Sequence, residues 1–150
     1  MKAALPLAVL MSALLASLSS PANACRFFEP VQNRIERGYS QGVIEAVARV
    51  EIASARHIRE AQGDTHPWRA TARLLQPVAG NNPPDTVEFE RGWGSAACEW
   101  SKPPLPQRGD VWIVYFWKDR AGALWPWLAM TDDDARRYDP KMAKAGPARD

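Results

Sequence analysis

The amino-acid sequence predicts an all-β domain with short helical additions, and three features indicate this fold class. Residues 111–117 are all β-branched or aromatic, which is the composition of a strand. Several other segments alternate apolar and polar residues with period two, as half-buried strands do. The chain also has 13 prolines and 9 glycines in 150 residues, which favours many turns over long helices.

Residues 1–24 have the pattern of a secretory signal peptide. Lys2 precedes an apolar run over residues 3–18, and Ala22 and Ala24 form a small-x-small cleavage signal. We therefore expect cleavage after Ala24 and a secreted or periplasmic protein that begins at Cys25. A rival interpretation is an envelope lipoprotein lipidated at Cys25, although lipoprotein leaders usually have Leu at the position of Ala22.

The rest of the chain is long enough for one domain, which we place at residues 25–139, followed by a flexible tail at 140–150. Cys25 and Cys98 are its two cysteines, and in an oxidising compartment we expect them to form a disulfide. The formal net charge is +2, and Lys and Arg are interleaved with Asp and Glu. This distribution argues against a nucleic-acid-binding surface, which needs clustered cations.

A short helix and a long strand are predicted first along the domain. Residues 30–38 begin with Pro and end with Gly, which suit a helix start and stop. Residues 42–56 alternate apolar and charged side chains, so we expect a half-buried strand. Its outward face should carry Glu45, Arg49 and Glu51.

A hairpin is predicted next, after a polar loop at residues 57–67. The loop contains His57 and His66, which have no metal-ligand spacing, so we expect both to be solvent-exposed. Residues 68–77 and 86–90 alternate apolar and polar side chains on either side of the turn-rich segment 80–85. Cross-strand pairing should place Arg69, Thr71 and Arg73 near Thr86, Glu88 and Glu90.

Residues 111–117 should form a strand largely covered on both faces, because both sets of alternate side chains are apolar. Such a strand lies centrally in a sheet or in the wall of a small barrel. After a turn at 119–122, residues 124–130 contain Pro126, which predicts an edge or bulged strand. Thr131 and the three following Asp residues favour the start of a helix that ends near Tyr138.

No segment indicates catalysis. Ser95 lies among small residues but lacks the glycines of a nucleophile elbow. Glu88, Glu90 and Glu99 could act as acid and base in principle, although carboxylates on an outward strand face are usually only solvated. The Asp residues at 132–134 fit helix capping better than calcium binding. We expect no enzyme activity, no metal and no cofactor.

The predicted order of elements, the N-terminal Cys25 and the segment 94–98 resemble the netrin-like modules, which include the tissue inhibitors of metalloproteinases and small bacterial relatives. The resemblance implies a five-stranded OB-type β-barrel. In the inhibitors, the first cysteine chelates the zinc of the target enzyme through its amino and carbonyl groups, a role that Cys25 would fill here. The Cys-x-Cys start of that family is Cys25-Arg26-Phe27 in this chain, so Arg26 would face the protease pocket.

A binding module for another ligand is the interpretation from a different class. All seven tryptophans follow the leader, and exposed aromatics on OB barrels stack on sugars or bases. Most of these tryptophans lie at strand positions that core packing explains. Trp93, Trp100 and Trp125 are the candidates for ligand contacts. We therefore expect a non-enzymatic binding module with an unknown protein or oligosaccharide partner, and metallopeptidase inhibition as the alternative.

Overall fold

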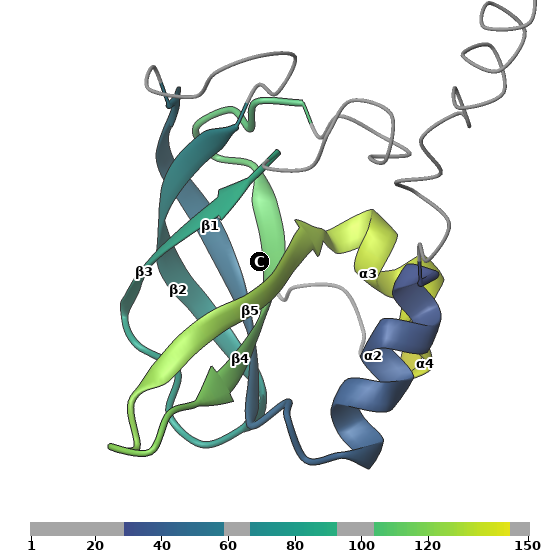
Figure 1. The fold of residues 1–150 in the computed structure, drawn as a ribbon. Helices are drawn as coiled ribbons and strands as arrows, with labels where there is room; N and C mark the ends of the chain where they lie inside the picture. The colour runs from purple at the N-terminus through teal and green to yellow at the C-terminus, as the bar shows by residue number, and fades with distance from the viewer. Residues whose placement is uncertain (1–28, 59–66, 93–103, 145–150) are drawn as a thin grey trace, which may run out of the picture.

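The computed structural model describes residues 29–58, 67–92 and 104–144 (Figure 1). This part of the chain forms a single five-stranded antiparallel sheet with short helices, in the strand order β3-β2-β1-β4-β5. The mostly β fold class predicted from the sequence is therefore confirmed. The elements are α2 (Val31–Ser40), β1 (Ala46–His57), β2 (Trp68–Gly80), β3 (Thr86–Arg91), β4 (Val111–Lys118), β5 (Leu124–Thr131), α3 (Asp132–Tyr138) and α4 (Pro140–Lys144).

The sheet is strongly curled about β1, which pairs with β2 on one side and β4 on the other (Figure 1). The β1–β2 ladder contains three register shifts, and such bulges increase the right-handed twist of a strand pair. The curl brings the edge strands β3 and β5 into contact, where Arg91 Nη1 donates to the carbonyl oxygen of Ala129 at 2.7 Å. No backbone ladder joins β3 to β5 within the described residues, so the sheet is not closed.

The first hydrophobic cluster lies on the inner face of the curled sheet. Its centre is an aromatic group in which Trp68 contacts Phe89 and Trp112 edge-on, with ring centroids 6.0 and 5.4 Å apart. Small residues from β1 and β2 surround these rings, as close packing of large side chains in a tight curl requires. The buried members are Ala46, Ala48, Val50, Ile52, Trp68, Ala70, Ala72, Val87, Phe89, Trp112, Val114, Phe116 and Ala129.

The second hydrophobic cluster lies between the outer face of the sheet and the helices, which gather on one side of the sheet (Figure 1). Ile35 is its buried contribution from α2, as expected for the apolar face of that helix. The sheet and the C-terminal helices supply the other buried members, which are Val47, Ile113, Tyr115, Met130, Ala135 and Met142.

Strand β1 is buried on both faces over residues 46–50, so the expected outward position of Arg49 is wrong, whereas Glu51 is exposed as expected. Val47 and Arg49 belong to the face that the helices cover, and Arg49 is only 2% exposed. The alternation of apolar and charged residues identified the strand correctly. It misassigned this face because the helix layer that covers Arg49 comes from a segment more than 80 residues later in the sequence.

The predicted hairpin between β2 and β3 is confirmed in its register. Arg69 pairs with Glu90, and Thr71 pairs with Glu88. The side chains interact as expected, since Arg69 Nε donates to Glu90 Oε1 at 2.7 Å. Strand β2 continues past the predicted end at Pro77 to Gly80. His57, expected in a loop, is the exposed last residue of β1.

Strands β4 and β5 follow their predictions except at the ends of β4. Residues 112–116 are buried on both faces, but Val111 and Trp117 are 36% and 40% exposed. The strand is therefore largely covered, as expected, and only its two ends lie beyond the clusters. Strand β5 is an edge strand, and Pro126 lies at a register shift in its ladder with β4, as expected from its missing N–H.

The C-terminal helices are anchored more firmly than the sequence predicted. Thr131 caps α3 as expected, since its hydroxyl oxygen accepts a hydrogen bond from the Asp134 backbone N–H at 3.1 Å. Helix α4 (Pro140–Lys144) occupies the start of the segment expected to be a loose tail. Met142 of this helix is buried in the second cluster. The order of the domain thus extends at least to Lys144.

Two glycines with positive φ provide a matched test of the close approach between β2 and β1. Gly80 has φ +78°, and a Cβ there would clash with the Glu45 carbonyl oxygen and lie 2.7 Å from Ala46 Cα. Gly122 has φ +88°, and a Cβ at this position would meet no atom within 4 Å. Both sites disfavour L-residues, but only Gly80 adds a backbone clash.

We predict that Gly122→Ala lowers the free energy of unfolding by about 1–2 kcal/mol through its backbone conformation. Gly80→Ala should lower it by at least ~3 kcal/mol, because β1 and β2 must also move apart. Urea denaturation of the two variants and the parent protein measures the difference. Equal losses in the two variants would show that the backbone approach at Gly80 carries no extra cost.

Candidate functional site

Two exposed tryptophans face each other across the β4–β5 hairpin, close to the turn that joins the two strands. Trp117 of β4 and Trp125 of β5 are direct partners in the antiparallel ladder, so their side chains project from the same face of the sheet. They are 40% and 54% exposed. Since large apolar side chains side by side in solvent often mark binding sites, this tryptophan pair is the candidate functional site.

Asp119 holds Trp125 in place from the turn between the strands. Its Oδ2 accepts a hydrogen bond from Trp125 Nε1 at 2.9 Å, and its Oδ1 accepts from the backbone N–H groups of Ala121 and Ala123, both at 2.9 Å. The Trp125 bond, followed by the Ala123 bond, lowers the pKa of the Asp119 carboxyl from its ordinary value. The group is therefore an anionic acceptor at neutral pH.

The structure shows the exposure of some of the tryptophans considered as ligand contacts. Trp125 is exposed, as expected, whereas Trp68 and Trp112 are core residues. The sequence analysis missed Trp117, which it assigned to the covered face of the central strand. Its position near the end of the strand, one residue before the turn, was the available signal, because a core often ends where a hairpin leaves the sheet. Trp93 and Trp100 lie outside the described residues.

The residues on which the netrin-like resemblance rests also lie outside the described part of the chain. These residues are Cys25, Arg26, the segment 94–98 and Cys98. The expected disulfide between Cys25 and Cys98 and the zinc-chelating role of Cys25 therefore remain predictions.

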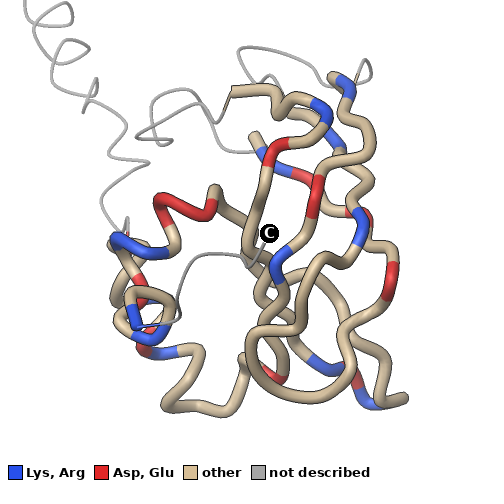
Figure 2. The backbone as a smooth tube through the Cα atoms, turned by 180° about the vertical axis from the view of Figure 1, so that it is seen from behind, with Lys and Arg blue, Asp and Glu red and all other residues tan. Residues whose placement is uncertain are grey.

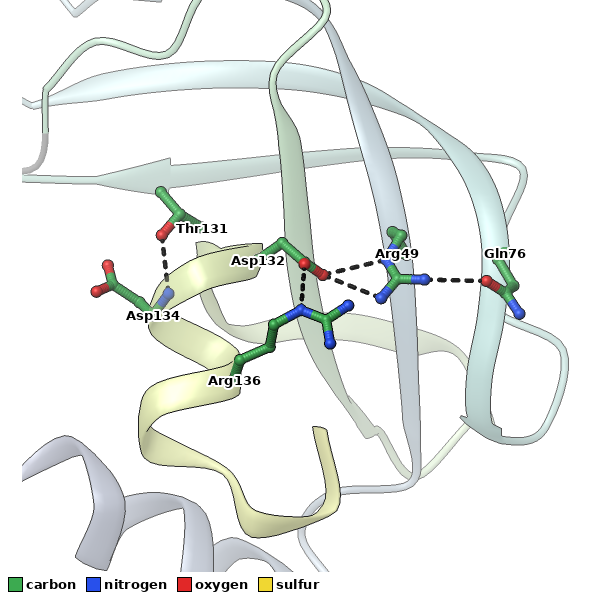
Figure 3. A network of polar contacts seen from close by, with 6 residues as sticks. All are labelled: Arg49, Gln76, Thr131, Asp132, Asp134 and Arg136. Carbon is green, nitrogen blue, oxygen red and sulfur yellow. Dashed lines mark hydrogen bonds and ion pairs between the residues drawn. The ribbon is translucent and has the colours of Figure 1, made fainter. Parts of the chain in front are cut away.

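A second polar feature joins α3 to the sheet through Arg49 (Figure 3). Its Nε donates to Asp132 Oδ1 at 3.1 Å, and its Nη1 donates to Gln76 Oε1 at the same distance. The Nη2 lies 3.1 Å from Asp132 Oδ1 as an ion pair, but it has no hydrogen bond of good geometry within the described residues. Asp132 Oδ2 also accepts from Arg136 Nε at 2.7 Å. This network ties β1, β2 and α3 together.

A third polar feature is the buried carboxylate of Asp139, between α3 and α4. Its Oδ2 accepts hydrogen bonds from the hydroxyls of Tyr39 and Tyr115, both at 3.0 Å. Its Oδ1 accepts from the Lys141 backbone N–H at 2.8 Å, which caps α4. Burial, and then the charge of Asp139, raise the pKa of both tyrosines. Asp139 therefore joins α2, β4 and α4, and its contacts indicate a structural role.

Among the described residues, the remaining charged side chains do not gather into a patch of one sign. Lys and Arg are interspersed with Asp and Glu along the described backbone (Figure 2). Glu88 and Glu90 engage Thr71 and Arg69 across the hairpin, which is the solvated pairing expected of them. Over residues 29–58, 67–92 and 104–144, no group of three or more His, Cys, Asp or Glu side chains could hold a metal ion.

No helix among the described residues has the length and apolar character needed to cross a membrane. Comparison of the chain with models of protein families, with curated proteins and with solved structures found no match.

The Arg49 network leads to a prediction about which partner matters more for stability. Asp132→Asn should lower the free energy of unfolding by about 1–3 kcal/mol, because it leaves the buried guanidinium of Arg49 without its counter-charge. Arg49→Met should lower the free energy of unfolding by less, because it removes the buried charge and an apolar side chain of similar length fills the space. Thermal and urea denaturation measure both variants.

Glu45→Gln is the control, because it disrupts only the exposed 3.4 Å ion pair with Lys118 and should change stability by less than about 1 kcal/mol. If Arg49→Met costs more than Asp132→Asn, the guanidinium itself stabilises the junction more than its burial destabilises it.

The tyrosine hydroxyls on Asp139 predict an alkaline loss of stability. The folded-state pKa of Tyr39 and Tyr115 lies above the unfolded value of about 10. The folded state therefore holds more protons than the unfolded state above pH 10, and the free energy of unfolding falls as pH rises beyond that point. The slope from each tyrosine should be about half of 1.4 kcal/mol per pH unit at pH 10 and approach 1.4 about one unit higher, with a smaller contribution from the partly exposed Tyr39.

Urea denaturation between pH 8 and pH 11 tests this for the parent protein, Tyr115→Phe and the Tyr39→Phe/Tyr115→Phe double variant. Each substitution should make the alkaline slope shallower by one tyrosine's contribution, whatever it does to stability at neutral pH. Parallel curves for all three proteins would contradict the assignment of the slope to these hydroxyls.

Proposed function

We propose that the protein is an exported, disulfide-linked, non-enzymatic binding module of the cell envelope or extracellular space. The tryptophan pair, Trp117 and Trp125, is its binding site. The observation that supports this most strongly is the exposure of two adjacent indoles on the same face, with one of them fixed by Asp119. Tryptophan is enriched among residues that dominate binding energy. Two indoles whose apolar surface stays in water also forgo the free energy that burial would supply.

The fold proposed for this module is an OB-type β-barrel. The strand order, the curl about β1 and the contact between β3 and β5 support the proposal. OB barrels are five-stranded and partly open, so a sheet whose edges touch without a backbone ladder is compatible with that architecture. The fold alone does not assign a ligand.

Export is proposed from the sequence of the leader, with cleavage after Ala24. The mature chain then begins at Cys25, and the disulfide to Cys98 would attach its N-terminus to the body of the domain. Intact-mass measurement and peptide mapping of the protein from its native host, with and without reductant, test these points together. A lipid adduct on Cys25 and a free thiol at Cys98 would instead establish an envelope lipoprotein.

The binding site is tested by sedimentation of the mature protein with washed cell envelopes of the host. The Trp117→Ala/Trp125→Ala double variant should bind with an apparent affinity lower by at least about tenfold, because truncation of anchor aromatics typically costs about 2 kcal/mol or more. Leu75→Ala is the matched control, since Leu75 is 47% exposed on β2 and not part of the pair.

Circular dichroism and urea denaturation confirm that the double variant is folded, so that lost binding is not lost structure. Equal binding of the double variant and the parent protein would remove the tryptophan pair from the proposed site.

A further inference from the structure

We infer that the tryptophan pair binds a neutral oligosaccharide of pyranose rings that carry equatorial hydroxyls. This inference rests on the proposed function and names the ligand class of that same site. Trp117 and Trp125 are direct partners across β4 and β5, so their Cβ atoms are about 4.5–5.5 Å apart. Both indoles are thus exposed on the same face of the hairpin. Pyranose rings with equatorial hydroxyls have flat C–H faces that pack against such a surface.

The hydrogen bond from Trp125 Nε1 to Asp119 Oδ2 determines what this ring offers to a ligand. Its only donor is satisfied within the protein, so the ligand meets the apolar face of the indole. Asp119 is itself held by the backbone N–H groups of Ala121 and Ala123. The ring is therefore oriented before the ligand arrives, which reduces the entropy lost on binding.

Polar groups beside the rings match the hydroxyls of a sugar. Within the described residues, Trp117 Nε1 has no hydrogen-bond partner, which leaves it as a donor. Asp119 Oδ2 accepts one bond from Trp125 and, as a carboxylate oxygen, has a second acceptor position. A hydroxyl both donates and accepts, so a pyranose ring can use the donor and the acceptor while its C–H face covers an indole.

The surroundings of the pair disfavour three other ligand classes. Nucleic acid also stacks on aromatics, but its phosphates would approach the anionic Asp119. A stable protein partner usually covers about 800 Å² of each surface, whereas two half-exposed indoles provide roughly 200–250 Å². For a membrane surface, the turn at 119–123 contains Asp119 and Arg120 and no large apolar side chain, so it adds neither net positive charge nor a further inserting group to the two indoles.

Isothermal titration of the mature, disulfide-intact protein with cellotetraose and with chitotetraose tests the ligand class. The parent protein should bind at least one of them with a submillimolar Kd. Trp125→Ala and Trp117→Ala should each raise that Kd at least tenfold, and Leu75→Ala should leave it within twofold. Asp119→Ala should raise it several-fold, because Trp125 is then no longer fixed and one acceptor is lost.

The result that overturns the inference is the absence of saturable binding to both tetrasaccharides, or binding that both tryptophan substitutions leave unchanged. Tryptophan-dependent binding of poly(dT) or of phosphatidylglycerol vesicles in their place would also overturn it. If envelope binding still depends on the tryptophan pair while both sugars fail, the proposed function stands and only the ligand class is wrong. If neither envelopes nor sugars bind, both are wrong.

Discussion

The burial of residues 46–50 of β1 on both faces is the constraint on which the rest of this structure depends. Its inner face contributes to the cluster around Trp68 and Trp112, and its outer face contributes Val47 to the cluster beneath the helices. A strand with two covered faces needs a layer on each side. The curled sheet supplies one layer by folding around its own inner face, and α2, α3 and α4 supply the other. The bulges in the β1–β2 ladder make that curl possible.

The helices are attached to the sheet mainly by apolar packing, and two buried polar junctions specify where they dock. Arg49 joins β1 to Asp132 at the start of α3, and Asp139 joins Tyr39 and Tyr115 between α3 and α4. Each junction satisfies most of the polar atoms that burial would otherwise penalise, although Arg49 Nη2 makes only an ion pair with Asp132 within the described residues. Because these bonds need one particular placement of the helices, they favour a single docked arrangement over sliding of one apolar surface on another.

The candidate site lies where this two-layer arrangement ends. Residues 112–116 are enclosed between the clusters, but the next residue, Trp117, lies beyond the cover and meets Trp125 across the hairpin. The turn chemistry of Asp119 then serves two purposes, since one carboxylate both closes the hairpin and orients an exposed indole. The exposed pair therefore lies at the rim of the two-layer scaffold, with Trp125 held by Asp119.

Local chemistry in the sequence determined most of the elements. The alternation of apolar and polar residues predicted β1, β2 and β3, and the charge pairing of Arg69 with Glu90 predicted the hairpin register. Pro126 predicted the edge strand, and Thr131 predicted the start of α3. Each of these depends on residues near one another in the chain or on an adjacent strand. Only the tertiary structure decided that Arg49 is buried, that α4 packs through Met142, and that Trp117 is exposed. Those outcomes depend on where one layer covers another, and the two layers come from segments far apart in the sequence.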